Sequence, residues 1–341
     1  MERSPAWKNG HFENPEPLVN DFSLSMSAMF HPSPDSSPQQ RLEVPKLSPH
    51  TWDEPPKAGL RVTWFGHAST LVEIDGIRVL TDPMWSHRPS PISWVGPERW
   101  FDPPIALADL PPIDAVVISH DHYDHLDYGS IVAMRDWKTP FIVPLGVGAH
   151  LAYWGIPEER IIELDWWERT RIGNAEIVCT PSRHASGRTL LDRDSKLWGS
   201  YAIVGPTHRV FFSGDTGLHR AMRDIGERLG PFDLTMLEVG QYHQAWPDWH
   251  MGPEQAVEAH RRVRGKTLLP IHWGLVSLAP HSWTEPIERV TAEAARTETR
   301  IVTPKLAEPL EIGGNEKTSQ WWPKLDVHTG KEDPIVSRHA D

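Results

Sequence analysis

The chain has 341 residues, of which 39% are hydrophobic, and it carries a formal net charge of −12. This length allows one large α/β domain or two average domains, and the apolar content is enough for a real core. The negative charge argues against a nucleic-acid partner and against electrostatic docking on an anionic membrane. The single cysteine, Cys179, excludes an intrachain disulfide, so nothing indicates an oxidising compartment.

The first 60 residues are rich in proline and are expected to form an irregular extension packed on the domain. The amino terminus lacks the apolar core of a signal peptide, and no apolar run of about 18 residues could span a bilayer, so we expect a cytoplasmic protein. Within the extension, FSLSMSAMF (22–30) alternates apolar and polar residues, which predicts an extended strand. Its apolar side could also form a lip near a lipid, which leaves peripheral membrane contact open.

The regular domain is expected over residues 61–312, followed by a polar, loosely held tail over 313–341. Two β-rich runs flank Asp75-Gly76, which predicts a hairpin. The alternation of strand-like and helical runs favours layered α/β sheets. Further strands are expected over 115–119, 141–145, 175–180, 200–205, 209–214, 234–239, 267–271 and 300–305, and helices over 217–229, 253–264 and 284–298.

The most distinctive stretch is SHDHYDHLD (119–127), which follows the strand-like run AVVIS. Alternate residues of an extended chain share a face, so His120 and His122 can converge on one ion. The chain must then turn, and Asp124 and His125 can reach a second position nearby. Imidazole and carboxylate groups together suit zinc and related divalent metals.

Three later strand-like runs also end in possible metal ligands, namely His184, Asp215 and His272. In open α/β sheets, sites cluster beyond the carboxyl ends of the strands, so these side chains are natural partners of the first group. Four strand ends of this kind favour a metal centre over solvated surface charge. A non-catalytic metal-binding scaffold is a third interpretation, but missing ligands would be expected there and none is missing.

The motifs GHAS, LTDPMWSHRPSP, GPERW, LPPIDAVVISHDHYDHLDY, LWGSY, FFSGDTG and IHWG resemble the N-acyl-phosphatidylethanolamine phospholipase D group and its bacterial relatives. The similarity runs in sequential order from about Arg61 to Pro286. This group has the metallo-β-lactamase fold, so the resemblance implies a four-layer αββα sandwich with two divalent metals at one edge of its two sheets.

The resemblance also implies a ligand set and a reaction. Zinc is the expected metal, and manganese or iron are alternatives because imidazole and carboxylate accept them too. A hydroxide bridging the two ions would attack phosphorus or a carbonyl carbon while the metals stabilise the developing charge. One metal would be held by His120, His122 and His184, and the other by Asp124, His125 and His272, with Asp215 bridging.

Further residues are candidates for contact with the substrate. Tyr123, between two ligands, could hydrogen-bond a phosphoryl oxygen or only orient its loop, and His250 could donate a proton to the leaving group. His67, in WFGHAST, is expected to be a structural histidine beneath the site. The candidate substrate-binding residues are Tyr242, Trp246 and His281.

The expected function is a binuclear metal-dependent hydrolase, a phosphodiesterase of the phospholipase D type. Amphipathic tryptophans near the expected site suit a small-molecule or lipid substrate with an apolar group. Two loops depart from the family pattern: Ala185 stands where an aromatic residue follows the third histidine, and YHQAWPDW lacks an arginine. Because a bidentate phosphate donor is lost there, a lactonase or other ester or amide hydrolase is the alternative.

Overall fold

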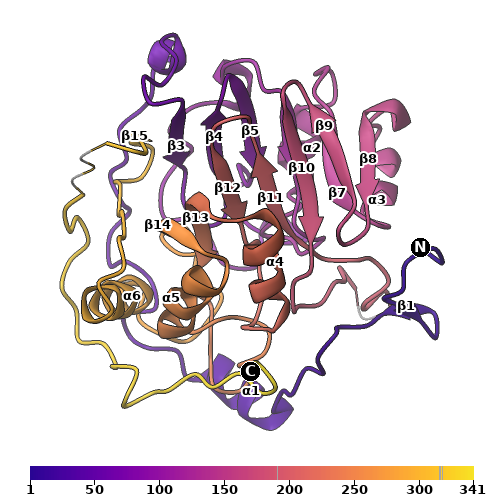
Figure 1. The fold of residues 1–341 in the computed structure, drawn as a ribbon. Coiled ribbons are helices and arrows are strands. Elements are labelled where there is room, and N and C mark those ends of the chain that lie inside the picture. Colours follow the sequence, from indigo (N-terminus) through magenta and orange to yellow (C-terminus); the bar gives the residue numbers. More distant parts are fainter. Residues whose placement is uncertain (190, 315, 317) are drawn as a thin grey trace.

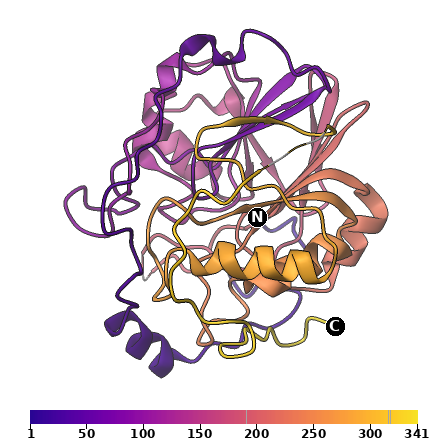
Figure 2. The ribbon, with the colours of Figure 1, turned by 90° about the vertical axis from the view of Figure 1, so that its left-hand side faces the viewer.

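The computed structural model describes residues 1–341 except 190, 315 and 317, and except the side chains of residues 22, 26 and 29. Two sheets lie face to face with helices on both outer sides, which confirms the four-layer αββα architecture (Figures 1 and 2). The helices are α1 (Phe22–Phe30), α2 (Tyr128–Ala133), α3 (Gly148–Tyr153), α4 (Ala221–Leu229), α5 (Pro253–Arg262) and α6 (Glu285–Arg296), with 3₁₀ turns at Pro49–Trp52, Leu107–Asp109 and Glu158–Arg160.

The larger sheet has the order β15-β3-β4-β5-β6-β7-β8 and the smaller one β14-β13-β12-β11-β10-β9. The larger comprises β3 (Leu60–Trp64), β4 (Thr70–Ile74), β5 (Ile77–Thr81), β6 (Ala115–Val117), β7 (Phe141–Pro144), β8 (Ile161–Leu164) and β15 (Pro309–Glu311). The smaller comprises β9 (Arg169–Ile172), β10 (Ala175–Thr180), β11 (Ser200–Val204), β12 (Arg209–Phe212), β13 (Phe232–Glu238) and β14 (Gly265–Ile271), and a separate ribbon pairs β1 (Trp7–Lys8) with β2 (His11–Phe12).

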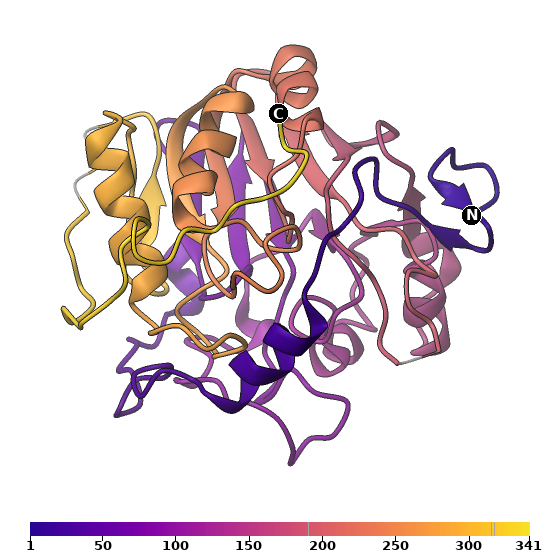
Figure 3. The same cartoon turned by 90° about the horizontal axis from the view of Figure 1, so that it is seen from below.

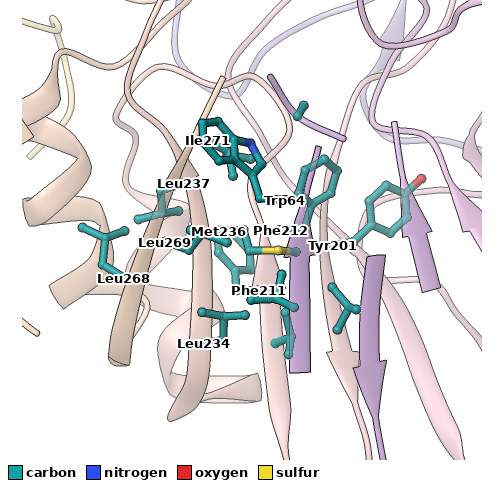
Figure 4. Close-up of a cluster of buried hydrophobic side chains, with 14 of the residues drawn as sticks. Trp64, Tyr201, Phe211, Phe212, Leu234, Met236, Leu237, Leu268, Leu269 and Ile271 are labelled. Atoms are coloured by element: carbon teal, nitrogen blue, oxygen red, sulfur yellow. The ribbon is translucent and has the colours of Figure 1, made fainter. Parts of the chain in front are cut away.

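Parallel pairing determines where the ends of the strands lie. Strands β5 to β8 are parallel in the larger sheet, and β12 to β14 are parallel in the smaller one. Parallel neighbours end at the same edge of a sheet, which is where loops gather functional side chains. Between the sheets, Trp64 of β3 lies beside Phe212 and Met236 from the opposite sheet (Figure 4). This apolar layer holds the two sheets against each other, so that the edges at which their parallel strands end lie side by side.

The hairpin predicted at Asp75-Gly76 joins β4 to β5 and is confirmed. Both turn residues have positive φ, 48° and 92°, as a two-residue hairpin turn of this hand requires. The Asp75 carboxylate accepts hydrogen bonds from the backbone N–H of Thr207 at 2.8 Å and of His208 at 2.9 Å. One turn therefore links the two sheets at the edge away from the predicted ligands.

The prediction of a strand over 300–305 is wrong, because only a single β-bridge forms in this segment. Ile301 pairs with Leu268, but Pro304 has no N–H to continue a ladder. The preceding N–H, of Thr303, donates instead to Thr318 Oγ1 at 2.9 Å. The segment is therefore extended without belonging to either sheet.

The strand predicted over 22–30 is also wrong, because this segment forms α1. Asp21 caps the helix by accepting a hydrogen bond from the N–H of Leu24 at 2.9 Å. A period-two pattern also places apolar residues four apart, so it is compatible with a short helix. The predicted apolar face includes positions 22 and 26, whose side chains lie outside the described ones. Helix α1 lies beneath the sheets (Figures 1 and 3).

The described part of the C-terminal segment has no helix or strand after Gly313, yet the prediction of a loosely held tail is wrong. The Trp321 ring stacks on Trp273 with centroids 5.3 Å apart, and Trp322 and Ile335 are buried. Trp273 directly follows His272, so the tail packs against a residue next to the expected site. The predicted domain boundaries stay a prediction. Among the described residues, no helix has the length and apolar character that crossing a bilayer requires.

Two buried histidines predict acid sensitivity of the fold. Burial lowers the pKa of His260 to about 4, and burial with Arg183 and Arg262 lowers that of His219 to about 3. The unfolded chain, with histidine pKa values near 6.5, binds more protons than the folded one below that pH. Stability should therefore fall from about pH 6.5 toward pH 4, by roughly 3 kcal/mol for His260 at about 1.4 kcal/mol per pKa unit.

Denaturant melts at several pH values between 7 and 4.5 would measure this loss. His260→Gln should flatten the dependence of unfolding free energy on pH, whereas His339→Gln, at an exposed position, should leave it unchanged. An unaltered slope in His260→Gln would contradict the prediction.

Candidate metal centre

Four strand ends place the predicted ligands at one edge of the two sheets. Residues 120–125 follow β6 of the larger sheet, whereas His184, Asp215 and His272 follow β10, β12 and β14 of the smaller one. All seven predicted ligands are brought together: His120, His122, Asp124, His125, His184, Asp215 and His272.

Three histidines form the first group. His122 Nδ1 lies 2.8 Å from His120 Nε2 and 3.2 Å from His184 Nε2. A tetrahedral ion with metal–nitrogen bonds of about 2.0–2.1 Å separates its ligand atoms by about 3.3 Å. The spacing of these three nitrogens therefore fits one ion of zinc-like size.

The second group consists of Asp124, His125 and His272. His125 Nε2 lies 3.2 Å from Asp124 Oδ2 and 3.2 Å from His272 Nε2, and the latter two atoms are 3.5 Å apart. These distances fit a second ion in the same way.

The carboxylate of Asp215 lies between the two groups. Its Oδ2 is 3.1 Å from His125 Nε2 and 3.8 Å from the Nε2 atoms of both His120 and His184, and its Oδ1 is 3.1 Å from His272 Nε2. Oδ1 is buried and accepts no hydrogen bond from the described residues. A bridging ligand would satisfy this orphaned oxygen.

The tautomers of two ligands are set from the larger sheet. His125 donates its Nδ1–H to Asp82 at 2.6 Å. Ser119 donates its hydroxyl to the same carboxylate at 2.6 Å and accepts the Nδ1–H of His120 at 2.9 Å. Both histidines are therefore held by Nδ1 with Nε2 directed into the centre, the atom through which each would bind a metal.

The smaller sheet orients the other two Nε2 ligands in the same way. His184 donates Nδ1–H to the carbonyl of Trp249 at 2.9 Å, and His272 donates to the carbonyl of Gly240 at 3.4 Å. Lone pairs that converge without protons between them repel one another, so the arrangement is suited to cations.

The electrostatics of the buried groups favour cations at the centre. Burial works to lower the pKa of His125, but Asp215 and Asp124 outweigh it and hold that pKa well above its usual range. Burial, followed by His125 and His122, lowers the pKa of His120 well below its usual value, so the ring is neutral. Burial works to raise the pKa of Asp124, but His125 outweighs it and holds the pKa well below the usual range. Neutral imidazole and ionised carboxylate are the forms that bind metals.

Three supporting residues surround the ligands. His67 donates Nε2–H to Asp124 Oδ2 at 2.8 Å, which agrees with its expected structural role. Asp82 and Glu238 are fully buried beside ligand histidines and were missed as part of the centre. Asp82 directly follows β5, and Glu238 is the last residue of β13. The search for ligand types at strand ends, which identified the predicted ligands, could therefore have identified both.

Tyr123 points away from the ligands on either side of it. Its hydroxyl donates to the carbonyl of Arg188 at 2.8 Å, and the Arg188 guanidinium lies 3.9 Å from the centre of its ring. Arg188 in turn donates to the carbonyls of Asp121 and Leu126, at 2.8 and 2.9 Å. The pair clamps the ligand loop from behind, and Tyr123 borders a neighbouring hollow rather than the metal cavity.

A cavity of about 680 Å³ opens onto the ligands. Its floor includes His122, Asp124, His184, Asp215 and His272, and its apolar wall consists of Leu18, Trp246, Trp249 and Leu278. Arg193, with a side chain 68% exposed, is the cationic residue of this lining. The cavity can hold a molecule with an apolar part next to a metal-facing polar part.

Two of the remaining candidates line this cavity. His250 donates Nδ1–H to Glu238 at 2.8 Å, which leaves its Nε2 for a substrate. Trp246 donates its indole N–H to the carbonyl of Gln241 at 2.9 Å and presents its ring to the cavity.

Tyr242 and His281 lie behind the wall. The Tyr242 hydroxyl donates to Glu285 at 2.7 Å, and its ring stacks on His281 with centroids 4.6 Å apart. His281 accepts the N–H of Gln241 at 2.9 Å and donates to the carbonyl of Ser282. They hold the loop that carries Gln241 and Trp246, and they do not line the metal cavity.

Comparison with known proteins agrees with this geometry. The chain is 45% identical over 329 residues to an uncharacterized protein of Mycobacterium tuberculosis, covering 94% of this chain and 88% of that protein. It is 36% identical over 292 residues to N-acyl-phosphatidylethanolamine-hydrolyzing phospholipase D 1 of Caenorhabditis elegans, covering 78% of this chain and 82% of that protein.

A solved metallo hydrolase, Igni18 of Ignicoccus hospitalis, shares the fold with a TM-score of 0.55 and 23% identity, covering 74% of this chain and 97% of that one. The beta-lactamase superfamily domain matches residues 77–273, which include all seven predicted ligands. The chain therefore belongs to the metallo-β-lactamase superfamily and is a metal-dependent hydrolase of that family.

Proposed function

We propose that the chain hydrolyses a phosphodiester in a substrate with an apolar group. The reaction uses two divalent ions, with zinc as the expected metal. The observation that carries the proposal is the make-up of one cavity, in which two convergent ligand groups form the floor and tryptophan and leucine side chains form the wall. The similarity to a phospholipase D that hydrolyses N-acyl-phosphatidylethanolamine supports this substrate class.

When bound, two such ions act as Lewis acids toward the substrate and lower the pKa of a water molecule. The side chains around them have separate tasks. Glu238 accepts the Nδ1–H of His250 at 2.8 Å, and although burial works to lower the pKa of His250, Glu238 outweighs it and raises that pKa. The protonated ring then carries an Nε2–H that can be delivered to a leaving oxygen at the cavity surface. The apolar wall binds the acyl or other apolar part and limits the access of bulk water.

Exposed apolar side chains next to the cavity support a lipid substrate. On α1, Leu24 is 40% exposed and Phe30 74%, and in the loop before Pro97, Trp94 is 77% exposed. The end of α1 and Pro97 border one hollow, which shares Leu278 with the metal cavity. These side chains could rest on a lipid surface as the cavity takes up a molecule from it.

One observation favours a lactone or another carboxylic ester as a second candidate. In the described lining, the cationic Arg193 lies at the rim and pairs with Asp194 at 3.3 Å. A neutral ester needs no cationic partner besides the metals, whereas a phosphodiester gains from one.

Hydrolysis assays on metal-loaded protein would test the proposal. Vesicles containing N-acyl-phosphatidylethanolamine and a soluble bis-aryl phosphodiester should both be cleaved, and a lactone panel between pH 6 and 9 should not be. Activity must be lost in His120→Ala. Turnover of lactones alone would establish the second candidate, and no metal-dependent turnover of any of these substrates would refute both.

A further inference from the structure

The N-terminal extension contributes a segment, residues 12–21, that we call the strap. It leads from the β1–β2 ribbon to α1 across the lower face of the molecule (Figure 3). Leu18 and Asn20 of the strap line the metal cavity, and so does Ser25 of α1. The strap is therefore one side of the site rather than a distant appendage.

Asn14 of the strap forms hydrogen bonds with both backbone polar groups of the predicted ligand His184. Its Nδ2 donates to the carbonyl of His184 at 2.7 Å, and its Oδ1 accepts the N–H of His184 at 3.0 Å. Oδ1 also accepts the indole N–H of Trp198 at 3.2 Å, which orients the amide. One side chain thus takes the place of a neighbouring strand.

His184 needs such a partner because it lies beyond the end of β10, outside both sheets. Among the described residues, its backbone N–H and C=O bond to Asn14 and to no other backbone group. Buried backbone groups must be paired, and Asn14 supplies both bonds within one rigid amide. This pairing sets the direction in which the His184 ring leaves the chain.

The strap also fixes the group that orients the ring of His184. Asp21 donates its N–H to the carbonyl of Ala245 at 2.8 Å, and Val19 donates its N–H to the Asp248 carboxylate at 2.8 Å. Both bonds hold the 245–249 loop, whose Trp249 carbonyl accepts the Nδ1–H of His184. Backbone and ring of the ligand are thus held through the same segment.

We propose that Asn14 is a positioning residue for the His120, His122 and His184 group, so that the N-terminal strap is required for full metal occupancy. The inference rests on the proposed two-metal centre. It predicts a selective defect, because Asn14 contacts the first ligand group and none of the described residues of the second.

Metal content and affinity test this without any activity assay. Asn14→Ala should bind metal at the first group about 10- to 100-fold more weakly, as is typical when the partner of a ligand is removed. After dialysis against a weak chelator, elemental analysis should find about two ions per wild-type chain and about one per variant chain.

A second variant separates positioning from space filling. Asn14→Asp keeps the volume and the oxygen that accepts from His184 and Trp198, but it places an oxygen against the His184 carbonyl. If Asn14 only filled space, this variant would keep both ions. Positioning requires that it lose the same ion as Asn14→Ala while its circular dichroism spectrum stays that of the wild type.

Asn174→Ala is the matched control, because Asn174 donates its amide to the carbonyl of Asp75 at 2.8 Å far from the site. It should keep two ions. If both Asn14 variants keep wild-type affinity, or lose both ions together, the inference is overturned while the metal centre stands. A wild-type chain that binds fewer than two ions refutes the proposed centre and this inference with it.

Discussion

Asp215→Asn is expected to reduce metal-dependent hydrolysis at least about 100-fold, since loss of a metal-site partner alone costs about 10- to 100-fold and Asp215 is itself a predicted ligand. The carboxylate lies 3.1 Å from His125 and 3.8 Å from both His120 and His184, so it is shared by both groups. Asparagine keeps the volume but removes the charge that compensates two cations. Both ions should therefore bind more weakly.

Initial rates with a saturating soluble phosphodiester and elemental analysis of the same samples would measure this. Asp136→Asn is the control, because the Asp136 side chain is 95% exposed and should change neither quantity. Full activity in Asp215→Asn would show that the reaction does not use this centre.

Asp248→Ala is expected to destabilise the fold by about 3–5 kcal/mol, as removal of one partner of a buried ion pair does. Asp248 and Arg183 are both fully buried and 2.9 Å apart. The same carboxylate accepts the N–H of Val19 and of Arg338, each at 2.8 Å. One residue therefore joins both ends of the chain to the strand end that carries His184.

Chemical denaturation at pH 7 would give the free energy of unfolding for this comparison. Glu176→Gln serves as the matched surface case, since Glu176 pairs with the exposed Arg169 at 3.3 Å and should cost less than about 1 kcal/mol. A loss in Asp248→Ala no larger than that of the control would mean that the buried pair is not what holds the termini.

The convergence of the predicted metal ligands could be foreseen because each lies at or shortly beyond the end of a strand of apolar and β-branched residues. The runs before His120, Asp215 and His272 are strands β6, β12 and β14, and the hairpin at Asp75-Gly76 depends on two adjacent residues. Patterns of this kind are local, and the sheet itself then brings distant strand ends together.

The roles of Tyr123 and Tyr242 could not be predicted, because they depend on contacts that no local pattern shows. Tyr123 turns toward Arg188, and the Tyr242 hydroxyl reaches Glu285, which is 43 positions away. The packing of the tail and the contact between Asn14 and His184 are of the same long-range kind. Helix α1 was predicted to be a strand because a short period-two pattern does not distinguish the two, and the helix-capping residue Asp21 was overlooked.

Cys179 lies near the end of β10 and is fully buried, and burial raises the pKa of its thiol far above neutrality. Thiolate is the reactive form, so alkylating reagents should leave the folded chain unlabelled. The unmodified chain should therefore give no background labelling when thiol-reactive spectroscopic probes are used. A cysteine introduced at Ser25, beside the cavity, would be the only site to take a spin label or a fluorophore and would report directly on movements of α1.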